Sequence, residues 1–243
     1  MLTGAPADIP IGGACAFQLP GDLSAASTAR SLVAATMRQL GFAPDPIEDA
    51  RLAVSELATN ALTHAPPALI PAAQPELWIW ARTRPAPQLV VSVFDAHRDA
   101  WPIALGAGLL DEHGKGLCIV AALATDTGIH LTRSRLTVSP GKRVWFTLPL
   151  TAPWPADGSA IAPISAADRL TAALRSRGVP TTLRSDDHGV SLLTAGTTNI
   201  WVEPKAFAWH DGQGYTRHPL ADLQETAERI VGHHETRTLT SPS

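Results

Sequence analysis

The segment Glu56–Ala65 (ELATNALTHA) constrains this chain more than any other stretch, because it places two polar residues inside an apolar helical pattern. The pattern begins near Pro46, and its apolar positions are Ile47, Leu52, Leu57 and Leu62. In a helix, Glu56 and Asn60 lie one turn apart on the same face. Asparagine disfavours helix interiors because its side chain competes for backbone hydrogen bonds. The pair therefore suggests a polar site facing a cavity.

The chemistry of these two side chains suits a metal and a proton acceptor. The carbonyl oxygen of Asn60 is a hard ligand of the kind that Mg²⁺ prefers. The carboxylate of Glu56, one turn away, can orient a water or take a proton. Taken alone, the same pair also fits a solvated glutamate beside a tolerated asparagine, so the rest of the chain has to decide.

Two strands with a connecting turn follow the helix. Residues 76–83 (ELWIWART) and 88–94 (QLVVSVF) alternate well enough to predict two strands, and residues 84–87 connect them as a hairpin. Asp95 stands at the end of the second strand, where its carboxylate can accept a hydrogen bond from an exocyclic amine. The alternative is an aspartate that only closes a turn.

A glycine-rich turn comes next, directly before an apolar helix at 118–124. The turn consists of Gly114, Lys115, Gly116 and Leu117. Glycines let the backbone approach phosphate groups, and a helix N-terminus offers free N–H groups and a positive dipole end. Lys115 either adds a charge there or is solvated. The turn stands about twenty residues after Asp95, with the Glu56/Asn60 pair upstream of both, which strengthens the interpretation as a phosphate site.

These pieces, together with ARSLVAATMRQLGF and GKRVWFTLPL, stand in an order and at a spacing that resemble the histidine-kinase-like ATPase superfamily over residues 12–150. Within it, the chain looks most like the small anti-sigma-factor serine kinases of bacterial partner-switching systems. The resemblance implies a Bergerat-type two-layer α/β sandwich that binds ATP and Mg²⁺.

The resemblance also assigns roles to individual residues. Asn60 would bind Mg²⁺, Glu56 would be the catalytic base, and Asp95 would bind adenine. Arg30 would contact a partner protein, although an exposed arginine without a role fits equally well. The residues implied in nucleotide binding are Asn60, Asp95, Gly114, Lys115, Gly116 and Leu117.

The sequence departs from the family pattern at two places. His97 stands two residues after Asp95, where a glycine is usual. Lys142 and Arg143 follow Gly141, where the family often has a small hydroxyl residue that helps to bind the base. The second departure puts one base contact in doubt.

Three functions are compatible with this pattern. The leading hypothesis is an ATP-dependent serine/threonine protein kinase that phosphorylates a small antagonist protein and sequesters a sigma factor, with a homodimer as the family's common assembly. The rival is a non-catalytic module that acts by protein contact and regulates transcription. A sensor histidine kinase fragment is disfavoured, because no dimerisation helix with a phospho-accepting histidine precedes the domain.

Composition bounds the remaining possibilities. The chain has 243 residues, enough for two domains, and a hydrophobic fraction of 45% is sufficient for a buried core. A net charge of −3 gives no argument for direct binding to nucleic acid or to an acidic membrane.

Cys15 and Cys118 are expected to be buried thiols in a reducing compartment. Without a signal-peptide pattern or a long apolar run, we expect a cytoplasmic protein.

The sequence predicts an α+β fold with two domains. We expect a flexible N-terminus at 1–13, the ATPase domain at 14–150, a linker at 151–163, a small domain at 164–232 and a tail at 233–243. The small domain has no recognised role.

The pattern of the small domain is α-β-β-β-α. It predicts a helix at 166–177, strands at 181–184, 190–195 and 199–202, and a last helix at 219–231. Its aromatic residues are expected in the core, and four histidines on the surface. The aromatic residues are Trp201, Phe207, Trp209 and Tyr215, and the histidines are His210, His218, His233 and His234.

Overall fold

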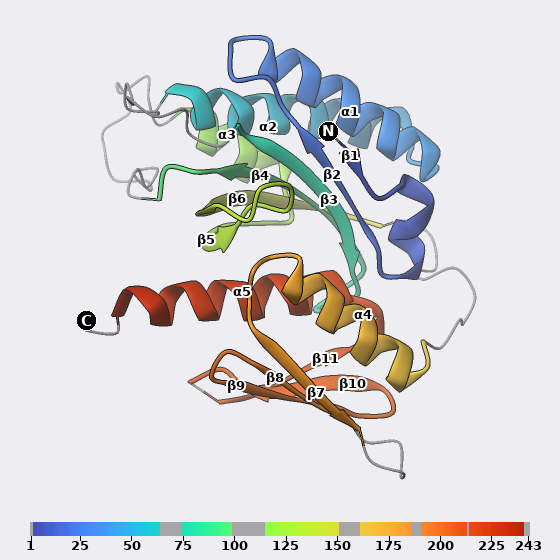
Figure 1. Ribbon diagram of the computed structural model, residues 1–243. Helices are drawn as coiled ribbons and strands as arrows, with labels where there is room; N and C mark the ends of the chain where they lie inside the picture. The colour runs from blue at the N-terminus through green and yellow to red at the C-terminus, as the bar shows by residue number, and fades with distance from the viewer. Residues whose placement is uncertain are drawn as a thin grey trace.

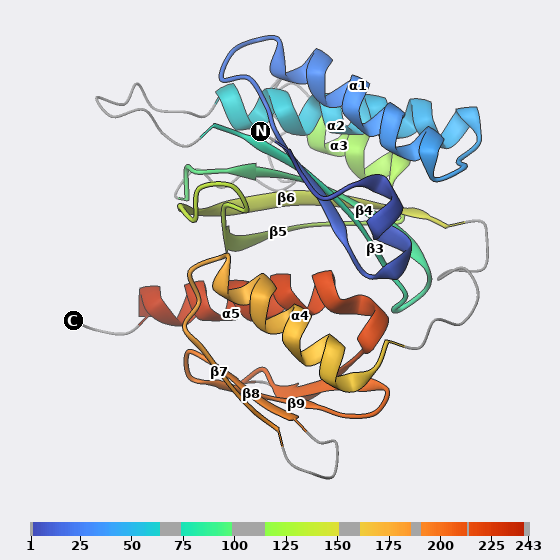
Figure 2. The ribbon, with the colours of Figure 1, turned by 45° about the vertical axis from the view of Figure 1, so that its right-hand side comes forward.

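The computed structural model describes residues 2–63, 74–98, 115–150, 161–185, 191–212 and 214–240. Its elements form four layers, in which helices and sheets alternate (Figure 1). Helices α1, α2 and α3 cover one face of the first sheet, helices α4 and α5 lie between the two sheets, and the second sheet closes the other side (Figure 2).

Among the described residues, six antiparallel strands form the first sheet in the order β1-β2-β3-β4-β6-β5. Their bounds are Leu2–Thr3 for β1, Ala14–Gln18 for β2, Glu76–Arg82 for β3, Gln88–Asp95 for β4, Asp126–Arg133 for β5 and Pro140–Pro149 for β6. The strands expected at 76–83 and 88–94 are thus confirmed to within a residue. Side chains alternate between the two faces, so each strand serves two different interfaces.

The helices on the first face enclose the main core. They are α1 (Ala25–Gln39), α2 (Pro44–Thr63) and α3 (Lys115–Leu123). Gly41, with a φ of +81°, follows the end of α1 in the left-handed region that glycine tolerates. Buried side chains from α1, α2 and the sheet fill the space between, including Val33, Met37, Val54, Leu57, Ile79, Val91 and Phe146.

The N-terminal segment is ordered, contrary to the expectation of a flexible stretch at 1–13. Strand β1 pairs with β2, and a 3-10 helix, η1 (Pro6–Ile11), packs against β2 and β3. Ile9 is buried in the main core, which gives this Pro- and Gly-rich stretch an apolar anchor. Its composition suggested disorder, but one buried side chain and one strand pairing hold it in place.

The C-terminal unit contains more strands than the sequence predicted. It comprises α4 (Pro163–Arg175), β7 (Thr181–Ser185), β8 (Ser191–Ala195), β9 (Thr198–Val202), β10 (Ala206–His210), β11 (Tyr215–Pro219), a short 3-10 helix η3 (Leu220–Asp222) and α5 (Leu223–Thr240). In the described part of this unit, five antiparallel strands lie in the order β11-β10-β9-β8-β7. The α-β-β-β-α prediction therefore missed β10 and β11. Residues 151–160 of the expected linker lie outside the described residues.

The aromatic prediction for this unit was half right. Phe207 and Trp209 are buried in the second core, but Trp201 is 45% exposed and Tyr215 is 60% exposed. Trp201 alternates with the buried Ile200 and Val202 on β9, so the strand pleat turns it to the outer face.

One histidine prediction was wrong for a similar reason. His218 is buried, with its ring 5.2 Å from that of Trp209, instead of lying on the surface. Burial and the nearby Arg229 lower the pKa of His218 to about 4. The neutral imidazole therefore belongs to the core of the second unit.

The two cysteines differ from each other. Cys15 is buried, as expected, and burial together with Asp8 raises the pKa of its thiol to about 11. Cys118 is exposed, which contradicts the expectation of two buried thiols. On α3 the side chains of Leu117 and Val120 take the core side, so the intervening Cys118 faces outward.

Helix α5 extends well beyond the expected end at 231. Its continuation through Thr240 includes Glu235, which is 1% exposed and ion-paired to Arg98 and Arg133 of the first unit. The expected frayed tail at 233–243 is thus helical up to Thr240, because these ion pairs hold it. No helix in the described ranges has both the length and the apolar character needed to cross a bilayer.

Candidate functional site

Helix α2 carries the polar pair that the sequence singled out. Glu56 and Asn60 are both half-buried, and they lie on one face of the helix, four residues apart. The same helix packs against α3, β4 and β6. The pair therefore lies on the helix that packs against both α3 and the interior strands β4 and β6 of the first sheet.

Gly116 at the start of α3 lies directly against the carboxylate of Glu56. A Cβ atom on Gly116 would come within 2.5 Å of Glu56 Oε2, so this position has no room for a side chain unless the carboxylate moves. The first turn of a helix offers N–H groups without intrahelical partners. The structure thus brings together the two motifs that the sequence placed sixty residues apart, as the ATPase interpretation requires.

Asp95 lies on the face of the first sheet that α1, α2 and α3 cover, in line with the buried Val91 and Val93. Its carboxylate is already engaged inside the protein. Asp95 Oδ1 accepts from the backbone N–H of His97 at 2.8 Å, and the ring Nδ1 of His97 is also 2.8 Å from it. Asp95 Oδ2 accepts from Nζ of Lys142, which also donates to the carbonyl oxygen of His97.

Lys142 owes this position to sheet register. It stands directly opposite Asp95 across the pairing of β4 with β6, and opposed side chains share a face. Asp95 is 5% exposed and Lys142 is 2% exposed. The sequence identified Lys142 only as a departure from the family pattern. Its ion pair with Asp95 was missed, because it depends on a register that the sequence does not give.

For the remaining predicted site residues, the described part of the structure gives no hydrogen bond or ion pair with Glu56, Asn60 or Asp95. Gly114 lies outside the described residues, and of Lys115 the structure describes only the backbone, at the first position of α3. Leu117 is half-buried against the main core. Arg30 is half-buried on α1, whereas the Glu56/Asn60 pair lies on the neighbouring helix α2.

The donor set fits Mg²⁺ better than a metal held wholly by protein. Within the parts of the chain that the structure describes, no three His, Cys, Asp or Glu side chains gather as metal ligands. Mg²⁺ commonly takes only one or two protein oxygens and completes its octahedron with water and phosphate. Asn60, with Glu56 one turn away, offers oxygens of that kind.

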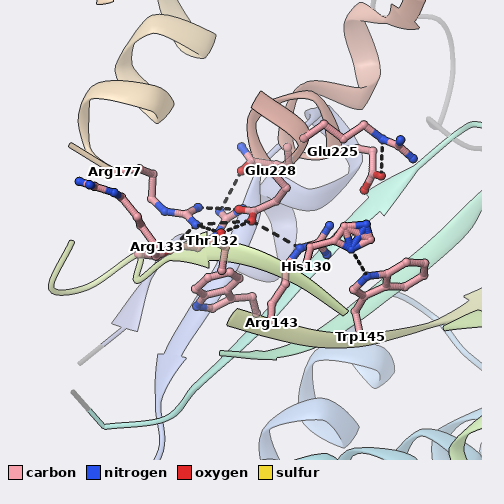
Figure 3. Close-up of polar contacts among 12 residues, drawn as sticks. His130, Thr132, Arg133, Arg143, Trp145, Arg177, Glu225 and Glu228 are labelled. Atoms are coloured by element: carbon pink, nitrogen blue, oxygen red, sulfur yellow. Dashed lines mark hydrogen bonds and ion pairs between the residues drawn. The ribbon is translucent and has the colours of Figure 1, made fainter. Parts of the chain in front are cut away.

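A second polar cluster lies on the opposite face of the sheet, where α5 packs (Figure 3). Glu228 is ion-paired to Arg135 at 2.7 Å and to Arg177 at 2.5 Å. Burial by itself raises the pKa of Glu228, but Arg177, Arg135 and Arg143 together lower it well below its ordinary value. The carboxylate therefore stays ionised inside the interface.

Arginines at this interface also lie over tryptophan rings. The guanidinium carbon of Arg177 is 4.8 Å from the ring centroid of Trp78, and that of Arg143 is 5.1 Å from Trp80. Arg143 was noted in the sequence as a departure near the base. The pleat instead turns it away from Lys142 and toward α5, so it serves the interface between the two units.

Comparison with known families agrees with this geometry. The family model of the histidine kinase-like ATPase domain matches residues 19–147, more than half of the chain. The chain belongs to the histidine kinase-like ATPase family. The match runs from the end of β2 into β6, so it contains the whole candidate site, and the C-terminal unit lies beyond it.

Family membership confirms the predicted superfamily and its mixed fold of helices and antiparallel sheet. It also supports ATP binding and use in general. No curated protein matches the chain.

Proposed function

We propose that this histidine kinase-like ATPase is a regulatory serine/threonine protein kinase that uses ATP and Mg²⁺. The observation that supports the proposal is the proximity of the Glu56 carboxylate to Gly116, in the turn that we propose binds the phosphates in this ATPase fold. A site that only holds a nucleotide needs no proton acceptor at that place.

The residues divide the chemistry between them. Asn60 would hold Mg²⁺, which when bound offsets the negative charge of the phosphates. Glu56 would accept the proton of the attacking hydroxyl while the new O–P bond forms and the bond to the leaving ADP oxygen breaks. The first turn of α3, with Gly116, would bind the phosphates through backbone N–H groups. Such a transfer depends mainly on positioning and electrostatics.

The proposed substrate is a serine or threonine on a small antagonist protein, in a switch that also sequesters a sigma factor. This part rests on the resemblance of the sequence to anti-sigma-factor kinases. Arg30 on the outer helix α1 is the proposed contact residue for such a partner, and a homodimer is the proposed assembly.

Nucleotide binding is tested by titration calorimetry with Mg²⁺-ATP. Wild type is expected to bind only when Mg²⁺ is present, and Asn60→Ala is expected to lose at least about tenfold in affinity, as the loss of a metal ligand predicts. Wild type that binds ATP equally well in EDTA would contradict the proposed role of Asn60.

Catalysis is tested separately, by following transfer of labelled γ-phosphate from ATP to water and to candidate antagonist proteins. Glu56→Gln is expected to lose about 10²–10⁴-fold in rate while retaining ATP affinity, because general-base catalysis contributes on that order. Glu48→Gln is the matched control, since Glu48 lies on the same helix in an exposed pair with Arg51.

The rival function is a non-catalytic binding module, and the engagement of Asp95 by Lys142 favours it. The two functions differ in one result. If Glu56→Gln and Glu48→Gln both transfer phosphate at the rate of wild type, the kinase proposal fails and the binding module stands. The same conclusion follows if neither wild type nor the variants transfer phosphate.

A further inference from the structure

Lys142 is ion-paired to Asp95, the residue that the resemblance to the family assigns to the nucleotide base. Its Nζ lies between two acceptors from one short segment, Asp95 Oδ2 and the carbonyl oxygen of His97. At 2% exposure, the ammonium group is enclosed by protein. A buried ammonium needs such partners, because an unpaired one would carry a large desolvation cost.

The pairing changes what Asp95 can offer to a ligand. A carboxylate has about four acceptor positions, and His97 and Lys142 use three of them. The one remaining position is on Oδ2, so the exocyclic amine of adenine would have to share that oxygen with the charged donor Lys142. Hydrogen bonds from charged donors are roughly twice as strong as those from neutral ones, so the neutral amine competes poorly.

Guanine presents the opposite chemistry at the same edge. It carries a carbonyl oxygen where adenine carries its amine, and Lys142 is a donor whereas a free aspartate is only an acceptor. An unpaired Asp95 would therefore favour adenine and reject guanine, but the Asp95–Lys142 pair removes most of that difference.

We propose that Lys142 is a specificity-determining residue that occupies Asp95, so that the site binds nucleoside triphosphates with little discrimination between adenine and guanine. The proposal rests on the proposed nucleotide-binding function. Affinity then comes from the phosphates and the metal, through the first turn of α3 and Asn60, and the base adds little.

Helix α5 supports this arrangement from the other face of the sheet. Arg98, next to His97, is ion-paired to Glu235 of α5 at 2.8 Å. Glu235 is 1% exposed and also pairs with Arg133. Glu235 thereby holds the segment whose Asp95 carboxylate and His97 carbonyl fix Lys142, which makes it a positioning residue for the same specificity.

The experiment is calorimetric titration of the full chain with Mg²⁺-ATP and with Mg²⁺-GTP, and the measured quantity is the ratio of the two dissociation constants. Wild type is expected to bind both within about threefold of each other. Lys142→Thr frees Asp95 and is expected to raise the preference for ATP by about tenfold or more. Lys142→Arg keeps the charged donor and is expected to keep the wild-type ratio.

Two further variants test the contribution of α5. Glu235→Gln is expected to shift the ratio toward ATP in the same direction as Lys142→Thr, but less. Glu225→Gln is the matched control, because Glu225 lies on the same helix and pairs with Arg82 and Arg229, away from the 95–98 segment. If Glu235→Gln and Glu225→Gln show the same ratio of ATP to GTP dissociation constants, the proposed role of Glu235 is overturned.

The outcomes separate this inference from the proposed function. A wild type that already prefers ATP tenfold, or a Lys142→Thr variant with an unchanged ratio, overturns the inference and leaves the nucleotide site standing. If neither wild type nor any variant binds either nucleotide while circular dichroism shows them folded, the proposed function itself fails, and the inference with it.

Discussion

The contact between Glu56 and Gly116 leaves no space for even one additional carbon atom at position 116 unless Glu56 moves. The carboxylate of Glu56 fills the space that any side chain at position 116 would need. The reason for a glycine at this position is the proximity of Glu56 and not its backbone conformation, since its φ does not lie in the left-handed region. The contact also fixes where the carboxylate lies relative to the first turn of α3, which is the geometry on which the proposed proton transfer depends.

Gly116→Ala should therefore lower activity without lowering stability. The new methyl group meets only the flexible end of Glu56, and alanine favours a helix over glycine by about 1 kcal/mol. We expect an unchanged or slightly raised melting temperature together with a loss of phosphate transfer of at least about tenfold. Gly214→Ala, in open space, is the control. Full activity in Gly116→Ala would disprove the contact's importance.

Helix α5 is unusual as an element because both of its faces are buried. Its apolar side packs in the second core through Leu223, Ala227, Ile230 and Val231. Its acidic side faces Arg82 and Arg143 of the first sheet, and Glu228 at the centre is fully enclosed. Charged residues on a helix normally indicate a solvated face, but here they face complementary charges on another unit.

Glu228→Gln should be strongly destabilising. The change leaves the buried Arg177 and the half-buried Arg135 without this charge partner, and removing one member of a buried ion pair costs about 3–5 kcal/mol. Denaturant titration measures this difference. Glu48→Gln removes an exposed ion pair and is expected to change stability by less than about 1 kcal/mol. Similar values for the two variants would show that the interface charges are solvated.

At the scale of the whole molecule, the two units are joined by buried polar contacts. Asp222, just ahead of α5, accepts a hydrogen bond from the backbone N–H of Thr83 at the end of β3, at 2.6 Å. Its side chain is fully buried, and burial raises its pKa to about 6 even though the bond from Thr83 lowers it. The Asp222 carboxyl group in this contact between the units therefore titrates in the mildly acidic range.

The stability that Asp222 contributes should depend on pH in a definite direction. Because its pKa is higher in the folded protein than the ordinary value of 3.8, the folded state binds more protons between these values. The contribution is complete below pH 3.8 and is lost as the pH rises through about 6. Relative to wild type, Asp222→Asn is expected to gain on the order of 2–3 kcal/mol over this range.

The measurement compares two curves of unfolding free energy against pH, from pH 4 to 7. The difference is needed because His218, whose pKa is lowered to about 4, acts in the opposite direction: its unfolded form binds more protons, so stability rises with pH. Parallel curves for wild type and Asp222→Asn would show that folding does not raise the pKa of Asp222.

What the sequence determined by itself was local. The helix with Glu56 and Asn60, the strand ending at Asp95 and the glycine-rich start of α3 follow from side-chain periodicity and from residues that begin or end helices. These signals act within a few residues, so the order of motifs identified the ATPase fold, and the limits of these three elements were predicted to within a few residues.

The tertiary structure alone decided which side chains meet. Sheet register paired Lys142 with Asp95, and the strand pleat sent the neighbouring Arg143 to the opposite face. The docking of α5 made its acidic face the buried partner of Arg82 and Arg143 from the first sheet. Register and docking depend on contacts between residues far apart in the chain, and no local pattern encodes them.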